Sequence, residues 1–377
     1  MPFDYEVIVA GLGAMGSSAA YHLAQSSVRV LGLDRFQPPH NFGSSHSLTR
    51  IIREAYFEHP LYVPLVQRAY ELWADLEKRA GHQLLLKTGG LMIGPLDGAL
   101  VSGASRSAEQ HHLDHEILNS TNLRQKFPMF NVEDEPIAVW EPRAGILFPE
   151  RAIQTHLELA ARLGAQLRFN DPVRKWEPFG KGVRVFTDAK CYTANHLVLS
   201  PGAWMSGLLP EPGLRLTVER QVLYWFKPVS HLELFRPDHF PIFIRQYAHD
   251  RFFYGFPELG DGVKVAFHHQ GGQVEPNALS QEVEPKEIEE MRQVLGKYLP
   301  DANGELRSTA VCMYTNTPDE HFVLDYHPEH PQVVVASPCS GHGFKFSPVI
   351  GEIVAGMVDG KDSQFDLDLF KIGRFDH

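Results

Sequence analysis

The chain contains little cysteine, no excess of positive charge and no long apolar run. Its three cysteines, Cys191, Cys312 and Cys339, form no CxxC pair and no metal-ligand spacing with histidine, which excludes a disulfide scaffold and gives no metal site. No run of eighteen apolar residues occurs and the first residues are acidic, so we expect neither a membrane span nor an export signal. The odd cysteine count fits a reducing compartment, and we expect the cytoplasm.

Acidic residues outnumber basic ones, 46 against 35, and the net charge of −11 argues against nucleic acid as a partner. With 43% hydrophobic and 21% charged residues, the composition is that of a folded globular protein rather than a disordered one. At roughly 150 residues per domain, 377 residues predict two domains. No internal repeat or low-complexity tract suggests a solenoid.

The first motif joins a strand to a helix. The apolar run Tyr5–Ala10 enters Gly11–Gly16, which reads GxGxxG, and Ser17–Gln25 then has the pattern of a small-residue helix. A second strand, Val28–Leu33, ends on Asp34, 23 positions after the first glycine. This order predicts a βαβ unit that binds a dinucleotide, and it does not distinguish FAD from NAD.

Each position of this motif has a physical role. Gly11 permits the tight turn, Gly13 lets a pyrophosphate approach the backbone, and Gly16 lets helix and strand pack closely. The helix N-terminus favours negative charge, and Asp34 is expected to accept ribose hydroxyls, unless it only caps the strand end. Ala14 and Met15, between the second and third glycines, are also expected to contact the cofactor.

Further along, the periodicity predicts an α/β fold with a discontinuous architecture. Apolar residues at helical spacing predict helices before Gly81 and before Gly164. Alternating aromatic and polar residues over 215–265 predict a mixed or antiparallel sheet, and a strand, glycine turn and helix recur over 333–358. We therefore expect a Rossmann-like domain of residues 1–85, 146–215 and 315–377, interleaved with a substrate domain of residues 86–145 and 216–314.

Three stretches are rich in functional side chains: residues 43–53, 311–315 and 341–346. With the Gly11–Gly16 motif, Tyr254–Pro257 and Pro318–Phe322, they make the chain resemble, over essentially its whole length, the monomeric sarcosine oxidase and N-methyltryptophan oxidase family, within the glycine oxidase and D-amino acid oxidase group. The resemblance implies FAD rather than NAD. It also implies a monomer that oxidises a secondary amino acid such as sarcosine to an imine, hydrolysed to amine and aldehyde, while O2 is reduced to H2O2.

The resemblance also implies roles for single residues. Cys312 would carry FAD through a thioether, although a lone cysteine is more often a small buried hydrophobe. Arg53 and Lys345 would hold the substrate carboxylate, and the Gly341 carbonyl would accept a hydrogen bond from the substrate amine. Without the motif, Arg53 and Lys345 would be read as surface charges. Cys191 and Cys339 are expected to be structural.

By the same resemblance, Arg50 lies at the flavin face, Lys264 is the site of oxygen activation and His268 keeps the substrate amine neutral. Pattern alone would make Lys264 an ordinary strand lysine. Tyr254 and Tyr314 would line the substrate cavity, although buried tyrosines often only fill space. The remaining implied FAD contacts are Gly43, Ser44, Ser45, Thr49, Val173, Gly202, Gly343 and Phe344, joined by Arg50 and Lys345.

Two alternatives and one open position remain. An FAD-dependent dehydrogenase would pass electrons to an acceptor other than oxygen, and a non-catalytic dinucleotide sensor would have no need for Cys312, His268 and Lys345 together. Arg245 would recognise a second acidic group if it faced the cavity, whereas a solvent-facing arginine is the usual state. The sequence does not identify which secondary amino acid is the substrate.

Overall fold

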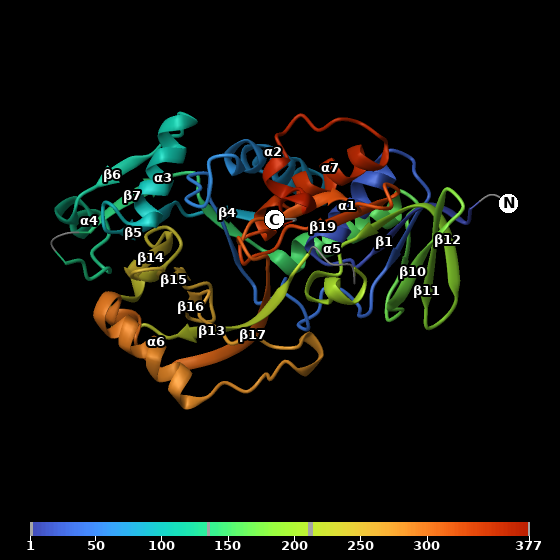
Figure 1. Ribbon diagram of the computed structural model, residues 1–377. Coiled ribbons are helices and arrows are strands. Elements are labelled where there is room, and N and C mark those ends of the chain that lie inside the picture. The colour runs from blue at the N-terminus through green and yellow to red at the C-terminus, as the bar shows by residue number, and fades with distance from the viewer. Residues whose placement is uncertain (1–2, 134–135, 210–213, 376–377) are drawn as a thin grey trace.

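A computed structural model describes residues 3–133, 136–209 and 214–375. In these residues two eight-stranded sheets and one three-stranded sheet are covered by helices, which confirms the predicted α/β fold. Figure 1 shows one large sheet at the right, with β1 and β10–β12, and the other at the left, with β5–β7 and β14–β16. No helix among the described residues combines the length and apolarity needed to cross a membrane.

The first large sheet has the strand order β10-β11-β12-β1-β2-β9, and β19 extends it from β12. Its centre is parallel, because β1 pairs in parallel with β2 and β12, and β12 pairs in parallel with β19. Alternate residues of β1 face opposite sides: Val7 and Val9 pack under helices, whereas Ile8 and Ala10 belong to the core on the other face. The strands are β1 (Tyr5–Ala10), β2 (Val30–Leu33), β9 (Gln166–Arg168), β10 (Val173–Phe179), β11 (Gly182–Thr187), β12 (Cys191–Leu199), β18 (Val323–Tyr326) and β19 (Val333–Ser337).

Four helices pack together beside this sheet. Helix α1 contacts both α5 and α7, and α2 contacts α7. The α1–α7 contact is close, since a Cβ on Gly351 would lie 2.2 Å from the Ser18 Oγ. The helices are α1 (Ala14–Gln25), α2 (Tyr62–Ala80), α5 (Pro149–Arg162) and α7 (Ser347–Val358).

The second large sheet has the order β17-β13-β16-β15-β14-β5-β7-β6. All its pairs are antiparallel except β14 with β5, so the predicted mixed sheet is confirmed. Its strands are β5 (Gly90–Gly94), β6 (Glu116–Leu118), β7 (Ile137–Glu141), β13 (Thr217–Phe226), β14 (Ile242–Ala248), β15 (Arg251–Phe256), β16 (Val263–His268) and β17 (Leu306–Asn316), with helices α3 (Ala99–Gln110), α4 (Ser120–Lys126) and α6 (Pro285–Tyr298).

A three-stranded sheet, β3-β8-β4, consists of β3 (Arg50–Ile52), β8 (Gly145–Leu147) and β4 (Leu85–Lys87). Its strand β3 carries Arg50 and is followed directly by Arg53, so this small sheet positions two of the predicted site residues. Helix α2 ends at Gly81 in the left-handed conformation, as the sequence predicts. Helix α1 begins at Ala14, three residues before the predicted start, and β2 begins at Val30 rather than Val28.

Candidate active site

One cavity receives residues from both large sheets and from β3. It extends from the glycine motif after β1 to the segment before α7. Of the residues predicted for the site, only Gly16 and Lys264 do not line it. Those that do are Gly11, Gly13, Ala14, Met15, Asp34, Gly43, Ser44, Ser45, Thr49, Arg50, Arg53, Val173, Gly202, Tyr254, His268, Cys312, Tyr314, Gly341, Gly343, Phe344 and Lys345.

Two glycines of the motif have different roles, one in packing and one in leaving room for a ligand. A Cβ on Gly16 would lie 1.7 Å from the Gly11 carbonyl oxygen, so Gly16 allows the helix to approach the strand. Gly13 lines the cavity, a Cβ there would have no atom within 4 Å, and the residue caps α1 without a side-chain hydrogen bond. The N–H groups at the start of α1 are therefore left for a ligand, which suits a pyrophosphate.

Asp34 holds the motif as well as lining the cavity. Its carboxylate accepts hydrogen bonds from the backbone N–H of Leu12 at 2.6 Å and of Phe36 at 2.8 Å. Burial raises the pKa of this carboxyl, while these two bonds oppose the rise. Asp34 therefore does cap the end of the strand, which is the alternative role that the sequence allows. Its side chain also lines the cavity.

Two thiols line the cavity. Cys312, on β17, is buried, and burial raises its pKa while the nearby charges of Arg50 and Lys264 lower it. Burial raises the pKa of Cys339 to about 11, and its sulfur lies 3.4 Å from the Ser337 Oγ. Of the two thiols, Cys312 is therefore the one whose rise in pKa is opposed by nearby cationic groups. Cys191, in contrast, is exposed.

Arg53 and Lys345, which also line the cavity, are both buried. The Arg53 Nη2 donates to both carboxylate oxygens of Glu58 at 2.7 Å, and Nη1 donates to the Ala55 carbonyl at 2.9 Å. The Lys345 Nζ donates to the His342 carbonyl at 2.6 Å. The Arg53 guanidinium already binds one carboxylate, that of Glu58, and Lys345 is a second buried basic group. This pair is suited to hold a carboxylate ligand.

The electrostatics of this pair favour an anion. The pKa of Lys345 is lowered to about 7, mainly by burial and also by the charge of Arg53, while the charge of Glu58 opposes the fall. Burial is the largest single influence on the pKa of Arg53 and lowers it, but the charge and hydrogen bond of Glu58, together with Tyr56 and Glu141, raise it by more in sum. An arriving carboxylate would favour the charged form of Lys345.

His268, Tyr254 and Tyr314 meet across the sheet. The Tyr314 hydroxyl lies 3.4 Å from the Tyr254 hydroxyl and 3.4 Å from the His268 Nδ1. Burial lowers the pKa of His268 well below its usual value, so its imidazole is neutral near pH 7. Gly341 has φ of 76°, and a Cβ there would approach the Tyr314 ring at 2.7 Å. The backbone at Gly341 can therefore come close to this group only because it lacks a side chain.

Lys264 lies behind the cavity wall. Its Nζ donates to the Ser47 carbonyl at 2.6 Å, the Thr49 carbonyl at 3.1 Å and the Thr49 Oγ1 at 2.9 Å. Burial and the charge of Arg50 lower its pKa well below the usual value. Lys264 is thus not the solvent-facing strand lysine that the pattern alone suggests.

Arg50 is fixed across the same loop. It donates from Nη1 to the Thr49 carbonyl at 2.8 Å and from Nη2 to the Ser44 carbonyl at 2.6 Å. These bonds join the guanidinium to the segment that contains three other predicted contacts, Ser44, Ser45 and Thr49. Because that segment also bonds to Lys264, one loop positions both cations.

Arg245 faces neither the cavity nor solvent, so both expectations for it are wrong. Its neighbour Ile244 lines the cavity, and successive strand residues point to opposite faces. The Arg245 guanidinium is buried, lies 4.0 Å from the centre of the Tyr298 ring on α6 and donates to the Asn131 carbonyl at 3.3 Å. It therefore belongs to the packing under α6.

Sequence reasoning missed several groups around the site. Glu58 pairs with Arg53, and Tyr56 contacts Lys345. His342 contacts Tyr56, and its place three residues before Lys345 in the 341–346 motif was a signal that could have found it. Glu219 bonds to His269, on segments that only the fold brings together. For Glu58, the one sequence signal was its acidic charge five positions after Arg53.

Comparisons with known proteins agree with this geometry. The profile of the family described as DAO, FAD dependent oxidoreductase, matches residues 6–357. A monomeric sarcosine oxidase of Streptomyces avermitilis is 46% identical over 94% of this chain and 93% of its own length. An N-methyl-L-tryptophan oxidase of Yersinia pestis is 38% identical over 99% of this chain and all of its own.

The fold has a known counterpart as well. The crystal structure of an L-proline dehydrogenase from P. horikoshii superposes with a TM-score of 0.85 at 20% identity, over 100% of this chain and 99% of the other. At that identity the likeness concerns the fold alone. The family match and the two full-length relatives identify the chain, which belongs to the FAD-dependent oxidoreductase family.

Proposed function

We propose that this protein is a flavoprotein oxidase of a secondary amino acid, with sarcosine and other N-methyl amino acids as the leading candidates. The observation that carries the proposal is that the buried Arg53 and Lys345 pair lines the same cavity as a dinucleotide motif. The names of the two full-length relatives, monomeric sarcosine oxidase and N-methyl-L-tryptophan oxidase, support the same substrate class. The proposed products are an imine, which water hydrolyses to amine and aldehyde, and H2O2.

FAD fits the residues present. The uncapped start of α1 and the open position at Gly13 suit the pyrophosphate, Asp34 suits the ribose, and Cys312 is proposed as the covalent attachment. When bound, FAD would take a hydride equivalent from the C–H bond beside the substrate amine, and the two electrons would pass to O2. The Arg50 guanidinium, which lines the same cavity and whose charge acts on Cys312, would supply fixed positive charge there.

The chain's own residues would bind and orient the substrate. Its carboxylate would replace Glu58 at Arg53, or join it, and would take a hydrogen bond from Lys345. The Gly341 carbonyl would accept from the amine, and neutral His268 would accept a proton as the amine becomes uncharged. Tyr254 and Tyr314 would bound the amine from the sheet side.

Lys264 is proposed to assist the reaction with oxygen. Its ammonium, held by Ser47 and Thr49, would add positive charge near the place where reduced oxygen forms. This role separates an oxidase from a dehydrogenase of the same fold. We also propose that residues 1–85, 146–215 and 315–377 form the FAD domain, residues 86–145 and 216–314 the substrate domain, and that the protein is a cytoplasmic monomer.

The first experiment is denaturing gel electrophoresis of acid-precipitated protein, viewed for flavin fluorescence. Fluorescence should travel with the wild-type chain and with Cys339→Ser, the matched control, and be lost with Cys312→Ser. Peroxide release with sarcosine and N-methyl amino acids then tests the reaction. Substrate oxidation that requires an artificial acceptor would indicate a dehydrogenase, and flavin binding without turnover of any secondary amine would indicate a sensor.

A further inference from the structure

Lys345 of the proposed carboxylate clamp belongs to a chain of three polar side chains. The Lys345 Nζ lies 3.2 Å from the Tyr56 hydroxyl, and that hydroxyl lies 2.5 Å from the His342 Nδ1. All three side chains are buried. The Tyr56 ring also lies beside Arg53, whose guanidinium carbon is 4.2 Å from the ring centre. Tyr56 therefore contacts both members of the clamp.

The hydrogen bonds fix the direction of this chain. The His342 Nε2 lies 3.1 Å from the Glu320 carbonyl oxygen, which only accepts, so Nε2 carries the proton. Burial lowers the pKa of His342 well below its usual value, and the ring is neutral. Nδ1 is then an acceptor, and the Tyr56 hydroxyl donates its one proton to it. The Tyr56 oxygen is left to accept from Lys345.

This arrangement accounts for two of the three protons on the Lys345 ammonium. One points to the His342 carbonyl at 2.6 Å and one to the Tyr56 oxygen at 3.2 Å. Lys345 lines the cavity, so the third proton is available to a ligand. A flexible lysine is thereby held in one orientation by two acceptors at fixed places.

We propose that Tyr56 and His342 are positioning residues, which act through Lys345 to aim its remaining N–H at the substrate carboxylate. The inference rests on the proposed function, since it takes Lys345 to be part of the carboxylate clamp. Neither residue is proposed to touch the substrate's reacting atoms. Their effect should therefore appear in the binding of carboxylates and not in the binding of simple amines.

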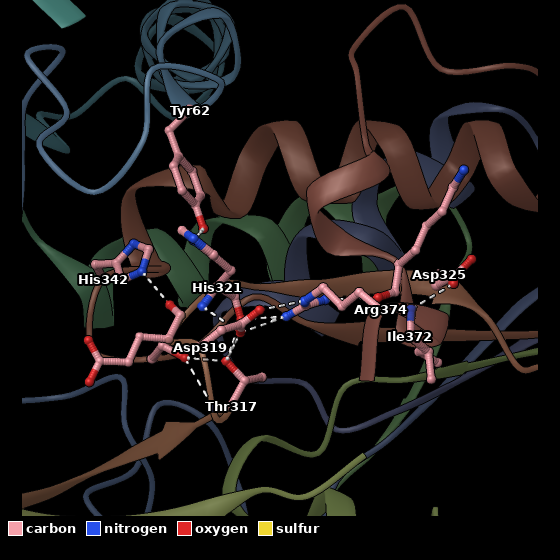
Figure 2. Close-up of polar contacts among 11 residues, drawn as sticks. Tyr62, Thr317, Asp319, His321, Asp325, His342, Ile372 and Arg374 are labelled. Carbon is pink, nitrogen blue, oxygen red and sulfur yellow. Dashed lines mark hydrogen bonds and ion pairs between the residues drawn. The ribbon is translucent and has the colours of Figure 1, made fainter. Parts of the chain in front are cut away.

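The acceptor that fixes His342 is itself held in place. Glu320 has φ of 59°, an uncommon conformation for a residue other than glycine. The loop around it is tied by the Thr317 Oγ1, which donates to the His321 carbonyl at 2.7 Å, and by Asp319, which pairs with Arg374 at 2.8 Å. Figure 2 shows Asp319 between His342 on one side and Arg374 on the other. The C-terminal segment thus supports the carbonyl that selects the His342 tautomer.

The charges around Lys345 set its response to pH. The charged groups near Lys345 are Arg53 and Glu58, on the segment that begins with β3. Tyr56 and His342, both neutral, accept hydrogen bonds from its ammonium. Helix α2 contributes the uncharged Trp73, whose Nε1 donates to the Lys345 carbonyl at 2.9 Å. Burial, with a smaller effect of Arg53, lowers the pKa of Lys345 to about 7. The Tyr56 oxygen stabilises the charged form, and its removal should lower that pKa further.

The test is titration of the flavin-loaded enzyme with acetate, followed by the change in flavin absorbance. Tyr56→Phe keeps the ring and removes the oxygen, and should weaken acetate binding about ten-fold. Tyr62→Phe is the matched control: its ring lies 4.7 Å from that of Tyr56, but its hydroxyl bonds to the His321 Nδ1 at 3.1 Å, and acetate binding should stay within about two-fold. Dimethylamine, which lacks a carboxylate, should bind equally to all three proteins.

The pH dependence separates positioning from a merely structural role. Wild-type acetate affinity should fall as the pH rises through about 7, and in Tyr56→Phe this midpoint should move to lower pH. His342→Leu, which leaves Tyr56 in place, should shift affinity in the same direction and serves as an independent second variant. Equal acetate affinity and an equal midpoint in Tyr56→Phe and wild type would overturn the inference. A wild-type holoenzyme that does not bind acetate would instead refute the clamp, and with it the proposed function.

Discussion

Two glycines of one motif should fail in different ways when each is replaced by alanine. At Gly16 the new Cβ would lie 1.7 Å from the Gly11 carbonyl oxygen and 2.6 Å from the Ser200 Oγ. The nearer atom belongs to the backbone, and no rotamer change moves it. At Gly13 no atom lies within 4 Å of the new Cβ, and the site faces the cavity.

The magnitudes follow from these distances. Relief of the Gly16→Ala contact needs a shift of α1 of about 1.5 Å, against α5 and α7, and such overpacking costs about 3 kcal/mol. The higher helix propensity of alanine offsets about 1 kcal/mol, so the flavin-free protein should lose about 2 kcal/mol of unfolding free energy. Gly13→Ala should leave this free energy unchanged or raise it by up to about 1 kcal/mol.

FAD affinity should show the complementary pattern. The Cβ of Gly13→Ala would stand where the pyrophosphate is expected, so FAD should bind weakly to a chain that is as stable as wild type. Urea unfolding of the flavin-free variants and fluorescence titration with FAD measure the two quantities separately. A Gly16→Ala protein as stable as wild type would refute the packing argument, and unaltered FAD affinity in Gly13→Ala would refute the assignment of the cavity.

Three other perturbations test the site. Arg53→Ala should raise the KM of a carboxylate substrate about 100-fold, and an unchanged KM would contradict the clamp. Because the change leaves Glu58 unpaired, it should also reduce the free energy of unfolding, measured in urea, by about 3 kcal/mol. Burial lowers the pKa of His269, but Glu219, with smaller help from Glu320 and the Ser340 backbone, raises it by more, so the pair contributes stability below pH 6.5 that is lost as pH rises through the raised pKa. Glu219→Gln should abolish that decline in urea unfolding, whereas an unchanged pH profile would exclude the pair as its cause. The two carboxylate oxygens of Glu141 each accept a hydrogen bond from a backbone N–H group, at 2.7 and 2.8 Å. In Glu141→Gln one of these oxygens is replaced by an NH2 donor, so the variant should be destabilised by about 1–3 kcal/mol in urea unfolding. Equal stability of the variant and wild type would refute this.

Local patterns were sufficient for much of the fold. The order of strand, glycine motif and helix in residues 5–34, the end of α2 at Gly81 and the sheet alternation over 215–265 are properties of neighbouring residues, and the structure has all of them. The errors lie at boundaries, such as the start of α1, where the backbone of Gly13 and not a polar side chain forms the cap. Capping through backbone geometry leaves no sequence signal.

The site was less accessible to such reasoning. Motifs drew attention to Arg53 and Lys345, but the burial of Arg245 depends on α6, which folds back over β14. Glu219 and His269 come into contact through the pairing of β13 with β16, two strands that are far apart in sequence. The tautomer of His342 depends on the Glu320 carbonyl, a backbone atom whose position no residue pattern encodes. Tertiary arrangement, and not residue identity, decides these features.

The interleaving of the first large sheet has a consequence for biosynthesis. The central strand β1 pairs with β12, so Val7 lies opposite His196, and β12 in turn pairs with β19 through Leu197 and Val333. Helix α1 packs against α7, which ends at Val358. The glycine motif is synthesised before β12, β19 and α7, so its supporting layer is complete only after residue 358 has emerged from the ribosome. Nascent chains released before residue 333 should therefore be unable to retain FAD.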